Sequence, residues 1–329
     1  SDHLNGLTLV APRGASLYFK DVEDHGIKVQ GVRDLTIRGF RLLGHKAKDK
    51  AFIYLRGPTP GLVLERLTIV GNGQSTGIAF VEDAIPDTEP PATVRDCELR
   101  ELRGGVDLLG YDDPNRRVRI EDNRFVSAGL HAEGAARQVL IAGNVFRDVL
   151  KSTAIEFFFR GESSGEVLVA NNSFFNCWSA SGFLDGGPKP ASVTSRFSAN
   201  LIFKPLGSFA LAACHPPDVP GTFVKPSDGA RMAEFWRLDH NWREGEPANM
   251  WLPVPVGPDD RRVEVLEVVS RDPNSPGFLQ PVTKSGPDTG GAGESDPTLP
   301  PYAGAVPPLG ALSWDWSAAW LALAEHPTP

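Results

Sequence analysis

The phrase Ile120-Glu-Asp-Asn123-Arg-Phe125 decides the fold of this chain, because close copies of it follow along the sequence. The copies are Ile141-Ala-Gly-Asn144-Val-Phe146, Val169-Ala-Asn-Asn172-Ser-Phe174, Phe197-Ser-Ala-Asn200-Leu-Ile202 and, less closely, Leu238-Asp-His-Asn241-Trp242. A fixed phrase at gaps of 21, 28, 28 and 41 residues is typical of a repeating coil with loops of different length. Asparagine tolerates the left-handed conformation of a tight bend, and a buried amide needs partners. We therefore expect the asparagines to stack, each bonding the bends above and below it.

The phrase continues towards the N-terminus without the asparagine. Phe40, Leu67 and Cys97 take its place in Ile37-Arg-Gly-Phe40, Leu64-Glu-Arg-Leu67-Thr-Ile69 and Val94-Arg-Asp-Cys97-Glu-Leu99. Each coil also holds a third apolar stretch: Ile27-Lys-Val29, Ile53-Tyr-Leu55, Ile78-Ala-Phe80, Val106-Asp-Leu108, Leu130-His-Ala132 and Ile155-Glu-Phe157. Three short strands per coil predict an all-β fold, a right-handed single-stranded parallel β-helix. The alternative, a β-sandwich or propeller, would show more Asn-Gly and Asp-Gly hairpin turns.

The pattern changes after Lys204. We expect the β-helix to occupy residues 1–245 and residues 246–329 to form a C-terminal tail packed on the solenoid. The tail is rich in Pro, Gly and Asp, with one expected strand at residues 262–269, so it should be extended and wrap the coils. Ser313 can cap a short terminal helix in which Trp316 and Trp320 share a face. Because the first coil lacks a capping element, we also expect the chain to be part of a longer protein.

Composition excludes several classes of function. The net charge is −8 and the chain has no Lys/Arg cluster, which argues against nucleic-acid partners. The sequence also lacks a run of 18 apolar residues, so we expect no membrane insertion by this segment. Cys97, Cys177 and Cys214 lack metal or disulfide spacing, so we expect free thiols, no cofactor and no metal site. The acidic loop that contains Glu82, Asp83, Asp87 and Glu89 is a candidate for weak calcium binding, although it lacks the ligand order of an EF-hand. We expect a monomer.

Candidate functional residues lie on the third strand of each coil, where alternate side chains point outward. The expected outward column is Lys28, Tyr54, Ala79, Asp107, His131, Glu156 and then Leu184 or Asp185. Because neighbouring coils lie about 4.8 Å apart, Asp107, His131 and Glu156 should form a contiguous acid–imidazole–acid row, bordered by Glu133 and Arg160.

This row has a catalytic and a non-catalytic interpretation. Two carboxylates about 10 Å apart lie near the upper range of an inverting glycoside hydrolase. Alternatively, His131 is the base of a lyase and removes the proton α to a uronate carboxylate. The non-catalytic interpretation is a solvated polar face, because outward solenoid positions are usually polar.

The coils at residues 31–203 resemble the pectate-lyase-like superfamily of right-handed β-helices, and the asparagine column is the specific part of this resemblance. The resemblance implies a polysaccharide lyase or glycoside hydrolase. However, the chain lacks the Arg-x-Pro-x-x-Arg of pectate lyases and the Gly-His-Gly and Arg-x-Lys of polygalacturonases, and only Asp112-Asp113 is similar to the paired aspartates of the latter. No catalytic role is therefore carried over to a residue of this chain.

A second resemblance concerns both ends of the chain. Leu7-Thr-Leu-Val-Ala-Pro-Arg-Gly-Ala15, Asp272-Pro-Asn-Ser-Pro-Gly-Phe278 and Trp314-Asp-Trp316 are similar to β-helical regions that follow the kinase domain of planctomycete-type bacterial receptor-like serine/threonine kinases. The chain has no His-Arg-Asp or Asp-Phe-Gly motif, so it has no kinase activity of its own. The resemblance implies an extracytoplasmic region of a larger receptor-like protein.

Two functional hypotheses follow, beside a purely structural interaction module. The preferred one is a non-catalytic region that binds or senses a ligand, most simply a glycan, through Lys28, Tyr54, Asp107, His131, Glu133, Glu156, Arg160 and Asp185. The alternative is a polysaccharide lyase or glycoside hydrolase that uses Asp107, His131 and Glu156. The first is preferred because the enzyme motifs are missing and the outward column has few basic groups to neutralise a uronate.

Overall fold

In the computed structural model, the described residues are 5–11, 14–19, 23–45, 47–81, 83–88, 90–110, 117–134, 138–158, 165–183, 193–203, 211–212, 237–244, 260–275 and 278–279. This part of the chain is built from strands and turns without a helix. It contains no helix with the length and apolar character that a membrane span requires. The expected terminal helix and Cys214 lie outside the described residues.

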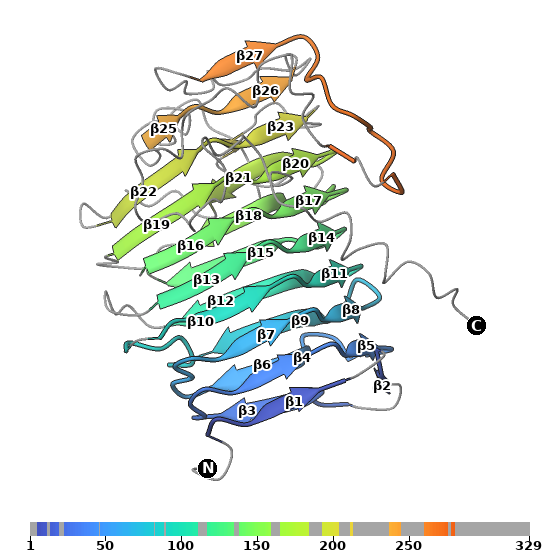
Figure 1. Cartoon of the computed structure of the whole chain (residues 1–329), viewed down its shortest axis with the longest axis vertical. Helices are drawn as coiled ribbons and strands as arrows, with labels where there is room; N and C mark the ends of the chain where they lie inside the picture. The colour runs from blue at the N-terminus through green and yellow to red at the C-terminus, as the bar shows by residue number, and fades with distance from the viewer. Residues whose placement is uncertain are drawn as a thin grey trace.

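The strands form three parallel sheets whose members stack like rungs from one end of the molecule to the other (Figure 1). The first sheet contains β1 (Thr8–Val10), β4 (Thr36–Arg38), β7 (Val63–Glu65), β10 (Ala92–Arg95), β13 (Arg117–Glu121), β16 (Gln138–Ala142), β19 (Gly165–Ala170), β22 (Val193–Ser198) and β25 (Arg237–Asp239). The second contains β2 (Ser16–Tyr18), β5 (Arg41–Leu43), β8 (Thr68–Val70), β11 (Glu98–Arg100), β14 (Arg124–Val126), β17 (Val145–Arg147), β20 (Ser173–Phe175), β23 (Leu201–Phe203), β26 (Trp242–Glu244) and β27 (Arg261–Val263). The third contains β3 (Ile27–Gln30), β6 (Ala51–Arg56), β9 (Thr76–Val81), β12 (Gly104–Gly110), β15 (Leu130–Gly134), β18 (Thr153–Phe158), β21 (Ser179–Phe183) and β24 (Leu211–Ala212).

This arrangement confirms the predicted parallel β-solenoid with three strands per coil. The handedness of the coil and the domain boundary at residue 245 stay predictions. Strand β27 pairs in parallel with β26, so the second sheet continues beyond that residue.

The core is made by the inward-facing residues of the three sheets, which align from coil to coil. In the first sheet, Leu64, Val94 and Ile120 stack in register and are fully buried. In the second, Phe125, Phe146 and Phe174 form a stack with ring centroids 4.5 and 5.1 Å apart and nearly parallel planes. Since burying a Phe side chain contributes about 1.5–3 kcal/mol, this continuous column is a main source of stability.

The expected asparagine ladder is present where the first sheet bends into the second. Each asparagine makes two hydrogen bonds to the Oδ1 of the asparagine in the following coil. Its Nδ2 donates at 3.0 Å and its backbone N–H donates at 2.9–3.0 Å, and this holds for Asn123, Asn144, Asn172 and Asn200. Each Nδ2 also donates to a backbone carbonyl of the coil below, as Asn144 does to Ile120 at 2.8 Å. The predicted stacking of buried amides is therefore confirmed.

The prediction that the asparagines themselves adopt the left-handed conformation is wrong. The residue before each of them does so, with φ between 53° and 68°: Asp122, Gly143, Asn171, Ala199 and His240. The left-handed residue turns the chain, and the next side chain then points into the bend, where its amide can reach two coils. From β4 to β26, this bend always has two residues between the strands.

The ladder has a distinct group at each end. At the lower end, the Cys97 N–H donates to Asn123 Oδ1 at 3.0 Å, and below it Leu67 is buried and Phe40 partly buried, as expected for an apolar column. At the upper end, Asp260 Oδ1 accepts both the N–H and the Nδ2 of Asn241, at 2.7 and 3.0 Å. Sequence reasoning missed Asp260, which continues the ladder with a carboxylate.

Residues 264–279, where described, pack on the outer face of the second sheet (Figure 1). Leu266, Phe278 and Leu279 share a buried cluster with Phe203 and Trp242. The Arg271 guanidinium pairs with the buried carboxylate of Glu244, and Arg124 donates to the carbonyl of Pro273 at 3.1 Å. These contacts hold the described part of the C-terminal region against the coils.

Candidate functional site

The predicted outward column of the third sheet exists in the register of the strands. Lys28 pairs with Tyr54, Tyr54 with Ala79, Ala79 with Asp107, Asp107 with His131, and His131 with Glu156. The expected last member is wrong, because Gly182 is opposite Glu156 and neither Leu184 nor Asp185 is. The reason is that β21 begins its pairing at Ser179, opposite Thr153, which sets the register two or three residues earlier than the sequence suggested.

Three other predicted residues are only partly covered by the structure. Glu133 lies in β15, in register with Leu109 and Phe158 and one alternation beyond His131. Arg160 and Asp185 lie outside the described residues. Their proposed roles stay predictions.

A groove of about 810 Å³ lies where the second sheet bends into the third, and four successive coils line it. The connections that enter the third sheet in these coils are residues 71–75, 101–103, 127–129 and 148–152. Two connections of three residues thus lie between two connections of five residues. The short connections form the floor of the groove and the long ones form its rims, so differences in loop length create the hollow.

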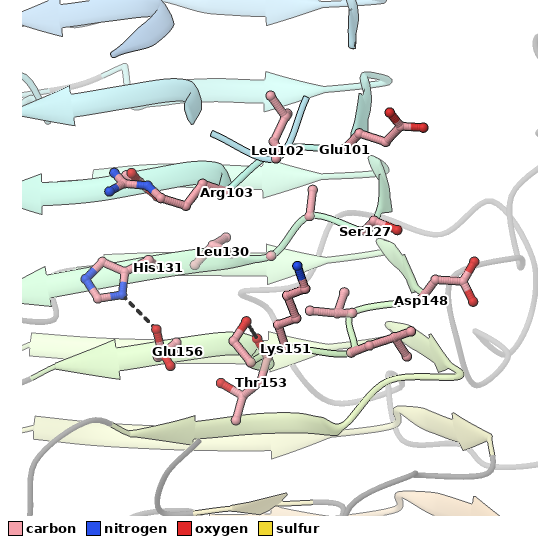
Figure 2. Close-up of a pocket in the computed structure, with 18 of the residues that line it drawn as sticks. Glu101, Leu102, Arg103, Ser127, Leu130, His131, Asp148, Lys151, Thr153 and Glu156 are labelled. Atoms are coloured by element: carbon pink, nitrogen blue, oxygen red, sulfur yellow. Dashed lines mark hydrogen bonds and ion pairs between the residues drawn. The ribbon is translucent and has the colours of Figure 1, made fainter. Parts of the chain in front are cut away.

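His131 and Glu156 form a hydrogen-bonded pair on one wall of this groove (Figure 2). His131 Nδ1 lies 3.2 Å from Glu156 Oε2, and the two side chains are 24% and 13% exposed. A proton on Nδ1 satisfies the carboxylate, and in the neutral imidazole Nε2 is then the basic nitrogen. The pair therefore offers an oriented imidazole to a ligand in the groove.

Asp107 lies beside this pair but is only 7% exposed. Thr76 Oγ1 donates to Asp107 Oδ2 at 2.9 Å, and a Cβ at Gly104 would overlap Asp107 Oδ1, so the glycine makes room for the carboxyl group. Burial raises the pKa of Asp107, and the Thr76 hydrogen bond and the charges of His131 and Arg103 offset this only in part. The Asp107 carboxyl group thus retains its proton to higher pH than an ordinary aspartate. Sequence reasoning missed the roles of Thr76 and Gly104.

Two basic side chains reach the groove from the connections and were also missed. Arg103 pairs with the Asp49 carboxylate, and its Nη2 donates to Thr76 Oγ1 at 3.5 Å. Lys151 is exposed on the long connection before β18 and extends towards the β15 coil (Figure 2). Arg103 directly precedes β12, whereas Lys151 lies two residues before β18, so the two share no fixed position in the repeat that could have found them.

Lys28 and Tyr54 are not among the described residues that line the groove. The Lys28 amine pairs with the Asp24 carboxylate, and the Tyr54 ring stacks on His25 with a centroid distance of 3.9 Å. They share the outward column with Asp107, but one face of the Tyr54 ring is already covered. The structure therefore brings together Asp107, His131 and Glu156, and leaves Lys28 and Tyr54 at a separate place on the column.

Cysteines and metal ligands add little chemistry in the described part of the chain. Cys97 and Cys177 are free, as predicted, and burial raises the pKa of each thiol to about 12. No group of three His, Cys, Asp or Glu side chains among the described residues is arranged to hold a metal ion. Glu82 and Glu89 of the acidic loop lie outside these residues, so calcium binding there stays a prediction.

Comparison with known proteins gave no match to a family model, to a curated protein or to a solved structure.

Proposed function

We propose that the groove binds a glycan. The observation that carries this proposal is a groove of about 810 Å³ with Asp107, His131 and Glu156 on one wall and Arg103 and Lys151 entering from the connections. A concave site of this size with a few converging polar groups is typical of ligand binding. Hydroxyl groups of a sugar can donate hydrogen bonds to carboxylate oxygens, and they can donate to or accept from the imidazole nitrogens.

We further propose that the glycan is acidic. The outward column has few basic groups, and the groove lining also carries the carboxyl groups of Glu101, Asp107, Asp148 and Glu156, but Arg103 and Lys151 supply two cations at the groove itself. Charge-assisted hydrogen bonds from Arg or Lys to a carboxylate are about twice as strong as neutral ones. A uronate is therefore the ligand unit that these side chains favour.

Calorimetric titration with polyuronates and neutral glycans, each with and without calcium, tests the proposal. We expect a polyuronate to bind, and Arg103→Gln or Lys151→Gln to weaken its binding about 10- to 150-fold, since one hydrogen bond to a charged group contributes about 1.5–3 kcal/mol. Arg33→Gln is the matched control, because Arg33 is exposed and not among the described lining residues. Absence of binding to every glycan, or an equal effect of Arg33→Gln, would refute a glycan site in this groove.

We also propose that this solenoid is an extracytoplasmic, pectate-lyase-like region of a larger bacterial receptor-like protein, in the manner of kinase-associated β-helices. The asparagine ladder and the phrases at both ends of the chain support this. The sequence of the complete gene tests it. A kinase domain and a membrane span in the same reading frame are expected, whereas a lone secretion signal would favour a secreted protein.

A second candidate function is catalysis in the same groove. Asp107, whose pKa is raised by burial, and the His131–Glu156 pair favour it. In a lyase, His131 would take the proton α to the uronate carboxylate, and Asp107 would protonate the leaving oxygen. Unsaturated products or new reducing ends that disappear in Asp107→Asn and His131→Ala would establish an enzyme. Glycan binding without such products supports a non-catalytic binding region.

A further inference from the structure

We infer that the groove is closed along the solenoid axis, so that it takes a short oligosaccharide or the end of a chain rather than the interior of a long one. This inference rests on the proposal that the ligand is a glycan. It adds which part of the glycan is recognised.

The two long connections close the groove at both ends along the axis. Asn72 and Gly73 line it on one side, and Leu150, Lys151 and Ser152 line it on the other. The described lining residues all belong to four successive coils, of which the first and the fourth carry the rims. Four coils span three steps of about 4.8 Å, so the axial length between the rims is about 14 Å.

Both rims are fixed to the neighbouring coils by hydrogen bonds. The Gly73 N–H donates to the Glu101 carbonyl of the next coil at 2.6 Å, and within the same rim Asn72 Oδ1 accepts the Gln74 N–H at 3.1 Å. The other rim is held at its base, where the Val149 carbonyl accepts the Trp178 N–H at 2.8 Å and Asp148 Oδ1 accepts from Asn176 Nδ2 at 2.5 Å. A ligand chain would therefore have to rise over the rims to continue along the axis.

The rim formed by residues 148–152 also presents contacts suited to the end of a ligand. Leu150 is 48% exposed, although large apolar side chains are mostly buried in this fold. The adjacent Lys151 leans over the floor of the groove (Figure 2). An end unit with an apolar ring face and a carboxylate matches this pair of side chains, whereas a chain that passed over the rim would lose both contacts.

The affinity for oligouronates of defined length tests this inference. A unit that spans one coil step fits about three times between the rims, so affinity should rise up to about three units and then change less than about twofold. With long polyuronates, the number of protein molecules bound per chain should stay constant as the chain lengthens. An affinity that continues to rise beyond about five units, or a bound number that grows with chain length, would overturn the inference.

A loop deletion gives an independent test. Removing Leu150 and Lys151 leaves a three-residue connection like those at residues 101–103 and 127–129. We expect this variant to gain affinity as the ligand grows beyond about three units. The length-matched control Leu150→Ser/Lys151→Gln should bind more weakly but keep the plateau. If the deletion variant does not fold, the affinity series on the unmodified protein still tests whether the groove is closed. If no oligouronate of any length binds, the proposal of an acidic glycan has itself failed.

Discussion

Asn144→Ala is the perturbation that tests the ladder most directly. Asn144 is fully buried. Its Nδ2 donates to Asn172 Oδ1 and to the carbonyls of Ile120 and Ala142. Its Oδ1 accepts the backbone N–H and the Nδ2 of Asn123. Alanine leaves the Asn123 N–H without this partner and removes a donor from the Ile120 carbonyl. Each buried polar group that loses its partner costs about 1–3 kcal/mol. We expect the free energy of unfolding to fall by about 3–5 kcal/mol, with part of the loss due to the small cavity.

Equilibrium urea unfolding followed by circular dichroism measures this loss. The midpoint should fall while the slope stays constant, which shows a change of stability rather than of the unfolded state. Asn274→Ala, at an exposed position, is the control and should change stability by less than about 0.5 kcal/mol. A loss below about 1 kcal/mol in Asn144→Ala would show that the ladder hydrogen bonds do not stabilise the coil.

Three further predictions concern the charged and crowded positions of the solenoid. Burial and the charges of Glu121 and Asp96 raise the pKa of Asp122 to about 8, so its contribution to stability is present below about pH 4 and is lost as the pH rises towards 8. Asp122→Asn should therefore increase the free energy of unfolding by about 1–3 kcal/mol at pH 9 but change it little at pH 4, which thermal melts at the two pH values measure. Gly104→Ala should displace the Asp107 carboxyl group, cost about 1–3 kcal/mol in urea unfolding and weaken ligand binding, and an unchanged affinity would contradict the assigned position of Asp107. Arg271→Ala leaves the buried Glu244 carboxylate without its guanidinium partner, so limited proteolysis should cut residues 264–275 faster, and an unchanged cleavage rate would show that this pair does not hold the segment.

The coil register could be predicted from the sequence because two signals agree. The apolar residues alternate with the period of a strand, and the asparagine phrase marks the same bend in each coil. Asp107, His131 and Glu156 were therefore placed correctly in one column. The register prediction failed at β21, because the residue opposite Glu156 is Gly182, which has no polar side chain to mark the outward position.

Other features could not be predicted, for separate physical reasons. Asp260 follows Asn241 by 19 residues and stands outside the apolar-x-x-Asn phrase, so nothing in the sequence linked its carboxylate to an amide ladder. Arg103 and Lys151 lie on connections, where the period of a strand does not determine the direction of a side chain. The groove itself depends on a comparison of connection lengths between coils, which requires strand ends to be known to one residue.

The ladder and the groove are two consequences of the same constraint. The bend from the first sheet to the second has two residues in every coil from β4 to β26, and from Cys97 upward its ladder residues bond the coils on either side. That corner fixes the register of each coil before the chain reaches the third sheet. The connection from the second sheet to the third can then vary between three and seven residues, from β5 to β21, without shifting the strands it joins. The position of the groove is therefore set by loop length at the variable corner, which is why shortening residues 148–152 should open the groove and leave β18 in register.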